Sequence, residues 1–321
     1  MEKGTWRFAA LTAAAAVLAA IGPAAEAAWP EKPVRVVVPF AAGGNSDITA
    51  RHFQRAIADN DLLGQPLTIV NVGGHFSIGS RQVMEAEPDG HTFLLIHLAL
   101  ISGEASGLID FGYRDFEPVA ATGELCLLPV VMEDSAYQTL DELLDAAAEN
   151  PDSIIFGANL GAVNHIGGIL LQNAKPGAKF RFVQIGGGAE NFEALVGRHT
   201  HAAVFAANEW ANSFRGGGAK ALAYMGAERH EAIPDVPTVR ELGYDVEYCM
   251  QNWWFAPKGT PQEAVDGFAE VLRRALETDY IREKLDEVLV TPVFYSGEAL
   301  DEQLDQTWER IEPVAKQAAQ K

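Results

Sequence analysis

The clearest chemical signal in the chain is a glycine-containing turn after an apolar run, VRVVVPFAAGGNSD at residues 34–47. The valines predict a strand covered on both faces, and Pro39 with the glycines ends that strand. The turn feeds a helix capped by Asn45 or Ser46, so several backbone N–H groups stay free at the positive end of the helix. Groups arranged in this way can hold a carboxylate or a phosphate.

Three more turns of this kind follow apolar runs, at residues 73–79, 157–165 and 186–189. One such turn is ordinary in any βα unit, but four of them, two in each half, predict a shared polar cleft. His75 and Phe76 are bulky residues inside a turn of small ones. They either line this cleft or pack against the opposite half of the molecule.

Signatures of catalysis and of metal binding are missing from the sequence. It holds no nucleotide P-loop, no G-x-S-x-G elbow, no H-E-x-x-H and no Cys/His cluster. The glycines at 186–188 lack the third glycine of a dinucleotide fingerprint, and His199 with His201 lacks a third ligand. We read His165 as a capping or packed side chain. We therefore predict no enzyme, no catalytic residue, no cofactor and no metal.

The order of strand and helix patterns predicts two α/β units. Strand patterns at 34–38, 66–72 and 91–99 alternate with helix patterns, and a second β-α-β-α-β unit runs from 135 to 225. We expect two lobes with two mixed sheets and a hinge, and a ligand cleft at the carboxyl ends of the strands. The predicted division is lobe 1 at 28–132 and 226–258, and lobe 2 at 133–225 and 259–321.

The first 27 residues have the pattern of a cleavable signal peptide. Lys3 and Arg7 precede an apolar run at 8–21, and an Ala-Glu-Ala motif ends at Ala27. We expect cleavage after Ala27 and export to the periplasm. In that oxidising compartment Cys126 and Cys249 either form a disulfide or remain two buried thiols.

The charge balance excludes several partners. The chain has 24 Lys and Arg against 44 Asp and Glu, a formal net charge of −20. This balance argues against nucleic acid and against anionic membrane surfaces as partners. It also repels an anionic ligand at long range, so an anion site must depend on local dipoles.

Several motifs in a fixed order resemble one family, the substrate-binding receptors of tripartite tricarboxylate transporters, also called Bug-type periplasmic receptors. The motifs are WPEKPVRVVVPFAAGGNSDITAR, EAEPDGHTFLL, YRDFEPVAA, GANLGAVNHI, GGGAENFEALVGR, IPDVPTVRELGY and WWFAPKGTP. The resemblance implies a type II periplasmic binding protein (Venus flytrap) fold. It also implies a small carboxylate ligand and delivery to membrane permease subunits. We expect a monomer.

The resemblance also implies the ligand-binding residues. Carried over by position, they are Phe40, Ala41, Gly43, Gly44, Asp47, Gly157, Gly161, Ala162, His165, Gly187, Gly188 and Ala189. The neighbouring turns add Asn45, Gly74, His75, Ala158, Asn159 and Asn208. We expect capture by the N–H groups of Gly43, Gly44 and the loop at 157–162.

The sequence departs from the family pattern at a few of these positions. Asn159 replaces a usual glycine, and Ala162 stands where a serine, threonine or glycine is common, which removes a possible hydroxyl donor. The turn at 73–77 is one residue short and bulkier, and His201 replaces a frequent aspartate. A smaller or aromatic acid is therefore as compatible as citrate. Two other functions stay open, a sensor that presents the acid to a membrane kinase and an enzyme acting on a small acid.

Overall fold

The computed structural model describes residues 1, 29–40, 42–43 and 45–319, and the predicted signal segment lies outside these ranges apart from residue 1. Strands and helices alternate along most of the chain. The strands are β1 (Val34–Val38), β2 (Leu67–Asn71), β3 (Thr92–Ile96), β4 (Phe116–Met132), β5 (Ile154–Ala158), β6 (Phe180–Gln184), β7 (Ala202–Ala206), β8 (Ala219–Ala221), β9 (Cys249–Pro257) and β10 (Thr291–Tyr295). The helices are α1 (Asn45–Asp59), α2 (Phe76–Met84), α3 (Ala99–Ala105), α4 (Leu140–Glu149), α5 (Val163–Ala174), α6 (Gly188–Val196), α7 (Ala207–Glu209), α8 (Gln262–Leu276), α9 (Asp279–Glu287) and α10 (Glu298–Ala319).

The sheet path confirms the predicted two-lobed α/β fold. Its order is β2-β1-β3-β9-β4-β7-β5-β6, with β8 and β10 paired to β4. The outer strands are parallel in both lobes, whereas β9 and β4 run antiparallel between them. Each lobe therefore has a mixed sheet, as predicted, and the shared strand β4 joins both parts into one continuous path.

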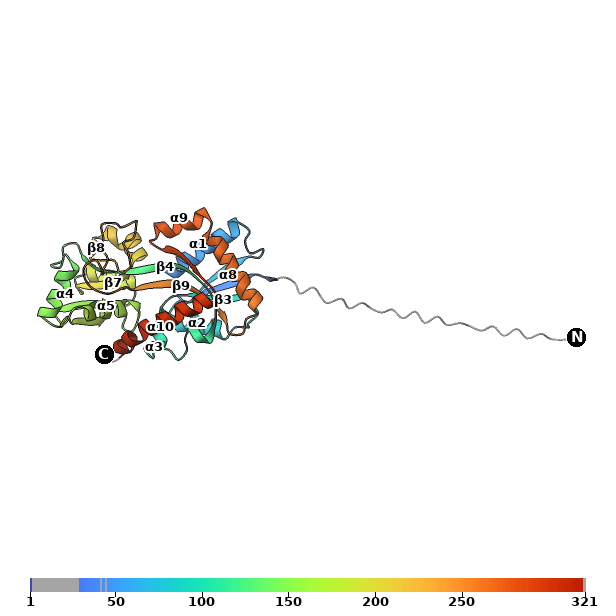
Figure 1. The fold of residues 1–321 in the computed structure, drawn as a ribbon, viewed down its shortest axis with the longest axis horizontal. Helices are drawn as coiled ribbons and strands as arrows, with labels where there is room; N and C mark the ends of the chain where they lie inside the picture. The colour runs from blue at the N-terminus through green and yellow to red at the C-terminus, as the bar shows by residue number, and fades with distance from the viewer. Residues whose placement is uncertain (2–28, 41, 44, 320–321) are drawn as a thin grey trace.

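Strands β4 and β9 connect the two lobes side by side (Figure 1). The first part of β4, up to Cys126, pairs with β9, and Leu127–Val130 pairs with β7 of the other lobe. Cys126 and Cys249 face each other at this changeover and form a disulfide. The question that the sequence left open is thus settled in favour of the bond, and these two strands make the hinge.

The core of the first lobe explains where the C-terminal helices pack. Trp253 and Trp254 are both buried, and Phe268 of α8 stacks on Phe93 with ring centroids 4.1 Å apart. Helix α9 contacts α1, and α10 contacts both α3 and α5. These contacts correct the prediction that 259–321 belongs to the second lobe, because the apolar face of α8 covers first-lobe strands. The rest of the predicted division remains a prediction.

Within the described residues, no helix is both long enough and apolar enough to cross a bilayer.

Candidate ligand-binding site

A cavity of about 450 Å³ lies between the lobes, within the usual range for small-molecule sites. The segments that follow β1, β2 and β3 line one side of it, and those that follow β5, β6 and β7 line the other. Leu127 of β4 and Met250 of β9 line it where the lobes join. The glycine turns of both halves therefore meet at one cleft, at the carboxyl ends of parallel strands.

Four helices of nine or more residues begin at the cavity wall. The lining includes Asn45 of α1, Phe76 of α2, Val163 of α5 and Gly188 of α6, each in the first turn of its helix. Among the described residues that line the cavity there is no lysine or arginine. In the absence of a cationic side chain there, the groups that can favour an anion are the helix N-termini with their positive partial charges.

The N-terminus of α1 carries two hydrogen-bond donors without a partner among the described residues. Ser46 lines the cavity with 2% of its surface exposed, and its Oγ is unpaired. The Nδ2 of Asn45 is also buried and unpaired, while its Oδ1 accepts a hydrogen bond from Asn208 of the second lobe. A buried donor left unpaired costs about 1–3 kcal/mol, so this wall gains stability from any acceptor that enters the cavity.

The predicted backbone capture is wrong at the positions that the structure describes. The Gly43 N–H donates to Asp47 Oδ2 at 2.8 Å, the Gly161 N–H to His165 Nδ1 at 3.0 Å, and the Ala162 N–H to the Asn159 carbonyl at 2.9 Å. All three amides already donate to acceptors within the protein. In two of the three cases the acceptor is a side chain four residues further along the chain, which reaches back to cap the loop. Ala41 and Gly44 lie outside the described residues.

The predicted ligand-binding residues separate into two groups. Those that line the cavity are Phe40, Asn45, Gly74, His75, Asn159, Gly161, Ala162, Gly187 and Gly188. Those that do not line it are Gly43, Asp47, Gly157, Ala158, His165, Ala189 and Asn208. Several members of the second group shape the loops, as Asp47 does. Burial alone would raise the pKa of Asp47, but hydrogen bonds from Arg51 and Gly43 lower it below its ordinary value.

Gly157 leaves room for the Asn191 side chain, which holds the triple-glycine turn by hydrogen bonds. Asn191 is fully buried, and its amide donates to the carbonyls of Gly186 and Gly187 at 2.7 and 2.8 Å. A Cβ at Gly157 would lie 2.4 Å from Asn191 Oδ1. The glycine is therefore needed so that Asn191 can reach the turn.

We expect Gly157→Ala to lower the free energy of unfolding by about 1–3 kcal/mol, because the added methyl displaces Asn191 from a packed position. Denaturant unfolding followed by circular dichroism measures this change. Gly216→Ala is the matched control, since a Cβ there meets nothing within 4 Å. Equal unfolding curves for the two variants would contradict this role of Gly157.

Two titratable side chains in the cavity wall were not among the residues predicted from the sequence. His97 follows β3 and stacks on Phe40 with centroids 4.8 Å apart, and burial lowers its pKa to about 4. Glu209 follows β7, and burial raises its pKa, aided by the charge of Glu190 and opposed by the Ala206 amide. Both lie just past the carboxyl end of a strand, which is the signal that could have found them.

Comparison with known proteins agrees with this geometry. The family model of the tripartite tricarboxylate transporter family receptor matches residues 49–319. The chain belongs to this family. The receptor is 29% identical over 273 residues to the protein BugT of Bordetella pertussis, covering 83% of this chain and 82% of BugT. It is thus a member of a family of periplasmic binding proteins.

Two solved structures from Rhodopseudomonas palustris share the fold of the receptor. MatC with bound malate is 27% identical with a TM-score of 0.75, and the match covers 89% of this chain and 100% of MatC. A second protein, solved with adipate, is 25% identical with a TM-score of 0.80 and covers 90% of this chain and 98% of its own. Both neighbours hold a small carboxylic acid.

Proposed function

We propose that the receptor captures a small carboxylate in the cleft between its lobes and delivers it to the permease of a tripartite tricarboxylate-type transporter in the membrane. The observation that carries this proposal is a pair of donors at the N-terminus of α1, Ser46 Oγ and Asn45 Nδ2, which have no hydrogen-bond partner among the described residues. Both donors lie in a cavity whose described lining includes no lysine or arginine. An anion there would be stabilised by helix dipoles and not by a cationic side chain.

The chemistry of capture follows from these donors. The Ser46 hydroxyl and the Asn45 amide donate to the carboxylate oxygens, and the positive end of α1 stabilises the charge. Hydrogen bonds to a charged group contribute about 1.5–3 kcal/mol each. Two such bonds supply about 3–6 of the roughly 8 kcal/mol that a micromolar Kd requires, and burial of the ligand in the cavity of about 450 Å³ has to supply the rest together with the cost of ordering the ligand.

Hinge closure completes the proposed mechanism. The lobes are joined through β4 and β9, and each lobe supplies one side of the cavity. A ligand that bridges both sides favours the closed arrangement, which presents a defined surface to the permease. The malate and adipate bound by relatives support a small carboxylic acid as the cargo.

Ligand screening tests the proposal directly. We expect mono- or dicarboxylates of small size to raise the melting temperature of the purified receptor, since a ligand at 100 times its Kd adds about 2.7 kcal/mol of stability. Isothermal titration then gives Kd for each acid that stabilises the protein. If no carboxylic acid in a panel of mono-, di- and tricarboxylates shifts the melting temperature, the proposal is overturned.

A further inference from the structure

One acidic side chain lies in the wall of a cavity suited to anions. Of the described residues that line the cavity, Glu209 is the only aspartate, glutamate, lysine or arginine. Its carboxylate lies against the first residue of α6, since a Cβ built on Gly188 would be 2.6 Å from Glu209 Oε2. The end of α6 that faces the cavity is therefore already occupied by a carboxylate of the protein.

Glu190 adds a second carboxylate at the same helix end. Its Oε2 would be 3.2 Å from a Cβ built on Gly187, and its negative charge acts on Glu209. Two acids beside the first turn of α6 offset the helix dipole there. The triple-glycine turn is thus a poor place for a ligand carboxylate, in contrast to the N-terminus of α1 with its unpaired donors.

Glu209 and the two donor residues of α1 line the same cavity. Asn208 donates a hydrogen bond across the cleft to Asn45 Oδ1, and Glu209 is the next residue after Asn208. Asn45 and Ser46 carry the unpaired donors on the other side of that contact. Because both groups line one cavity of about 450 Å³, a small ligand with two polar ends is the kind of molecule that would contact both.

We propose that the cargo is a small zwitterion, whose carboxylate binds Ser46 and Asn45 and whose ammonium group binds Glu209. This inference rests on the proposed function and names the class of acid. An ammonium group offers three donors to the Glu209 carboxylate. An ammonium beside Glu209 also favours the ionised form of that side chain, whereas a second ligand carboxylate would meet an acidic side chain and no lysine or arginine in the described lining. The net charge of −20 likewise repels a dianion more strongly than a molecule without net charge.

Two pairs of ligands isolate this effect, because in each pair an ammonium replaces one carboxylate at the same spacing. The pairs are β-alanine with succinate and 4-aminobutyrate with glutarate, and isothermal titration gives Kd for each. We expect the amino acid of at least one pair to bind at least tenfold more tightly than its dicarboxylate. We expect Glu209→Gln to reduce that preference at least tenfold. Glu190→Gln is the matched control. It removes a carboxylate beside the same end of α6, but Glu190 does not line the cavity.

The outcomes separate this inference from the proposed function. Tighter binding of the dicarboxylates by the unchanged receptor overturns the zwitterion assignment, whether or not Glu209→Gln folds. An equal preference in the unchanged receptor and in a folded Glu209→Gln variant, checked by circular dichroism, also overturns it. In both cases the receptor still binds acids and the proposed function stands. Only the failure of all carboxylates to bind overturns the proposed function itself.

Discussion

Replacing Ser46 by aspartate is expected to abolish carboxylate binding while the receptor remains folded. The new carboxylate would stand where we place the ligand carboxylate, next to the unpaired Nδ2 of Asn45. It would accept the free donors itself and repel the incoming anion in a buried site. We expect a loss of at least about 100-fold in affinity, which corresponds to about 2.7 kcal/mol. Isothermal titration with the acid that stabilises the unchanged receptor most strongly gives this number.

The fold should tolerate the change because a negative charge in the first turn of α1 interacts favourably with the helix dipole. Melting followed by circular dichroism checks this point. Ser46→Ala removes only one hydrogen bond and should weaken binding by about 1.5–3 kcal/mol. Ser153→Asp, at an exposed position, controls for the added charge and should leave Kd unchanged. Affinity retained in Ser46→Asp would show that the ligand carboxylate binds elsewhere.

The position of the cleft was predictable from sequence because its signals are local. Each apolar strand pattern followed by a glycine turn predicts the carboxyl end of a strand, and such ends meet on one edge of a parallel sheet. His75 was found in this way, whereas Phe40, Gly161 and Gly188 were carried over from the family resemblance, and all four line the cavity. Counting glycine turns in both halves was enough to predict that they share a cleft.

Which hydrogen-bond donors are available to the ligand could not be predicted in the same way. A glycine turn indicates free amides, but Asp47 and His165 reach back four residues and bond to Gly43 and Gly161. Whether a side chain caps an amide or points elsewhere depends on its rotamer and its packing, which periodicity does not encode. The unpaired hydroxyl of Ser46 is likewise visible only once its neighbours are placed around it.

Contacts between segments far apart in the chain were the second feature that the sequence could not predict. The apolar face of α8 fits any sheet, and the sequence does not say that Phe268 stacks on Phe93. The pairing of Cys126 with Cys249 required the register of β4 against β9, and 123 positions separate the two residues. A shift of one residue would have turned the sulfur atoms to opposite faces, because side chains alternate along a strand.

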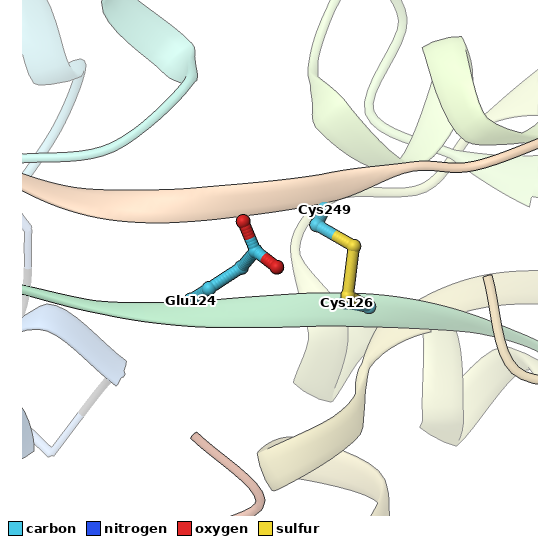
Figure 2. Close-up of side chains that lie close together, drawn as sticks. All are labelled: Glu124, Cys126 and Cys249. Atoms are coloured by element: carbon cyan, nitrogen blue, oxygen red, sulfur yellow. A yellow bond between two sulfur atoms is a disulfide. The ribbon is translucent and has the colours of Figure 1, made fainter. Parts of the chain in front are cut away.

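The disulfide lies at the changeover between the lobes and on the face of the strands away from the cleft. Figure 2 shows the bond spanning the two strands, with Glu124 close to it. The neighbouring residues Leu127 and Met250 line the cavity, and alternation directs the cysteines to the other face. Glu124 accepts a hydrogen bond from Gln251, and since the sulfur atoms are bonded to each other, this group offers no thiolate to a metal.

Removing the disulfide is expected to lower the free energy of unfolding by about 2–5 kcal/mol, because the bond closes a loop with a sequence separation of 123 and restricts the unfolded chain. Denaturant unfolding with and without a thiol reductant measures the difference. The double variant Cys126→Ala and Cys249→Ala should match the reduced protein and no longer respond to reductant. An unchanged midpoint in protein whose thiols titrate as reduced would contradict the prediction.

Ligand affinity should change much less than stability when the bond is removed. The backbone hydrogen bond from Leu127 to the Tyr248 carbonyl and the pairing of Leu125 with Met250 hold the register of the hinge without the sulfur atoms. Because the disulfide acts chiefly on the unfolded chain, the folded cavity keeps its shape. At denaturant concentrations and temperatures well below the unfolding transition, we therefore expect Kd to change by less than about threefold. Such a change corresponds to well under about 1.4 kcal/mol of binding free energy, which would be tenfold. A larger loss of affinity would show that the disulfide also sets the angle between the lobes.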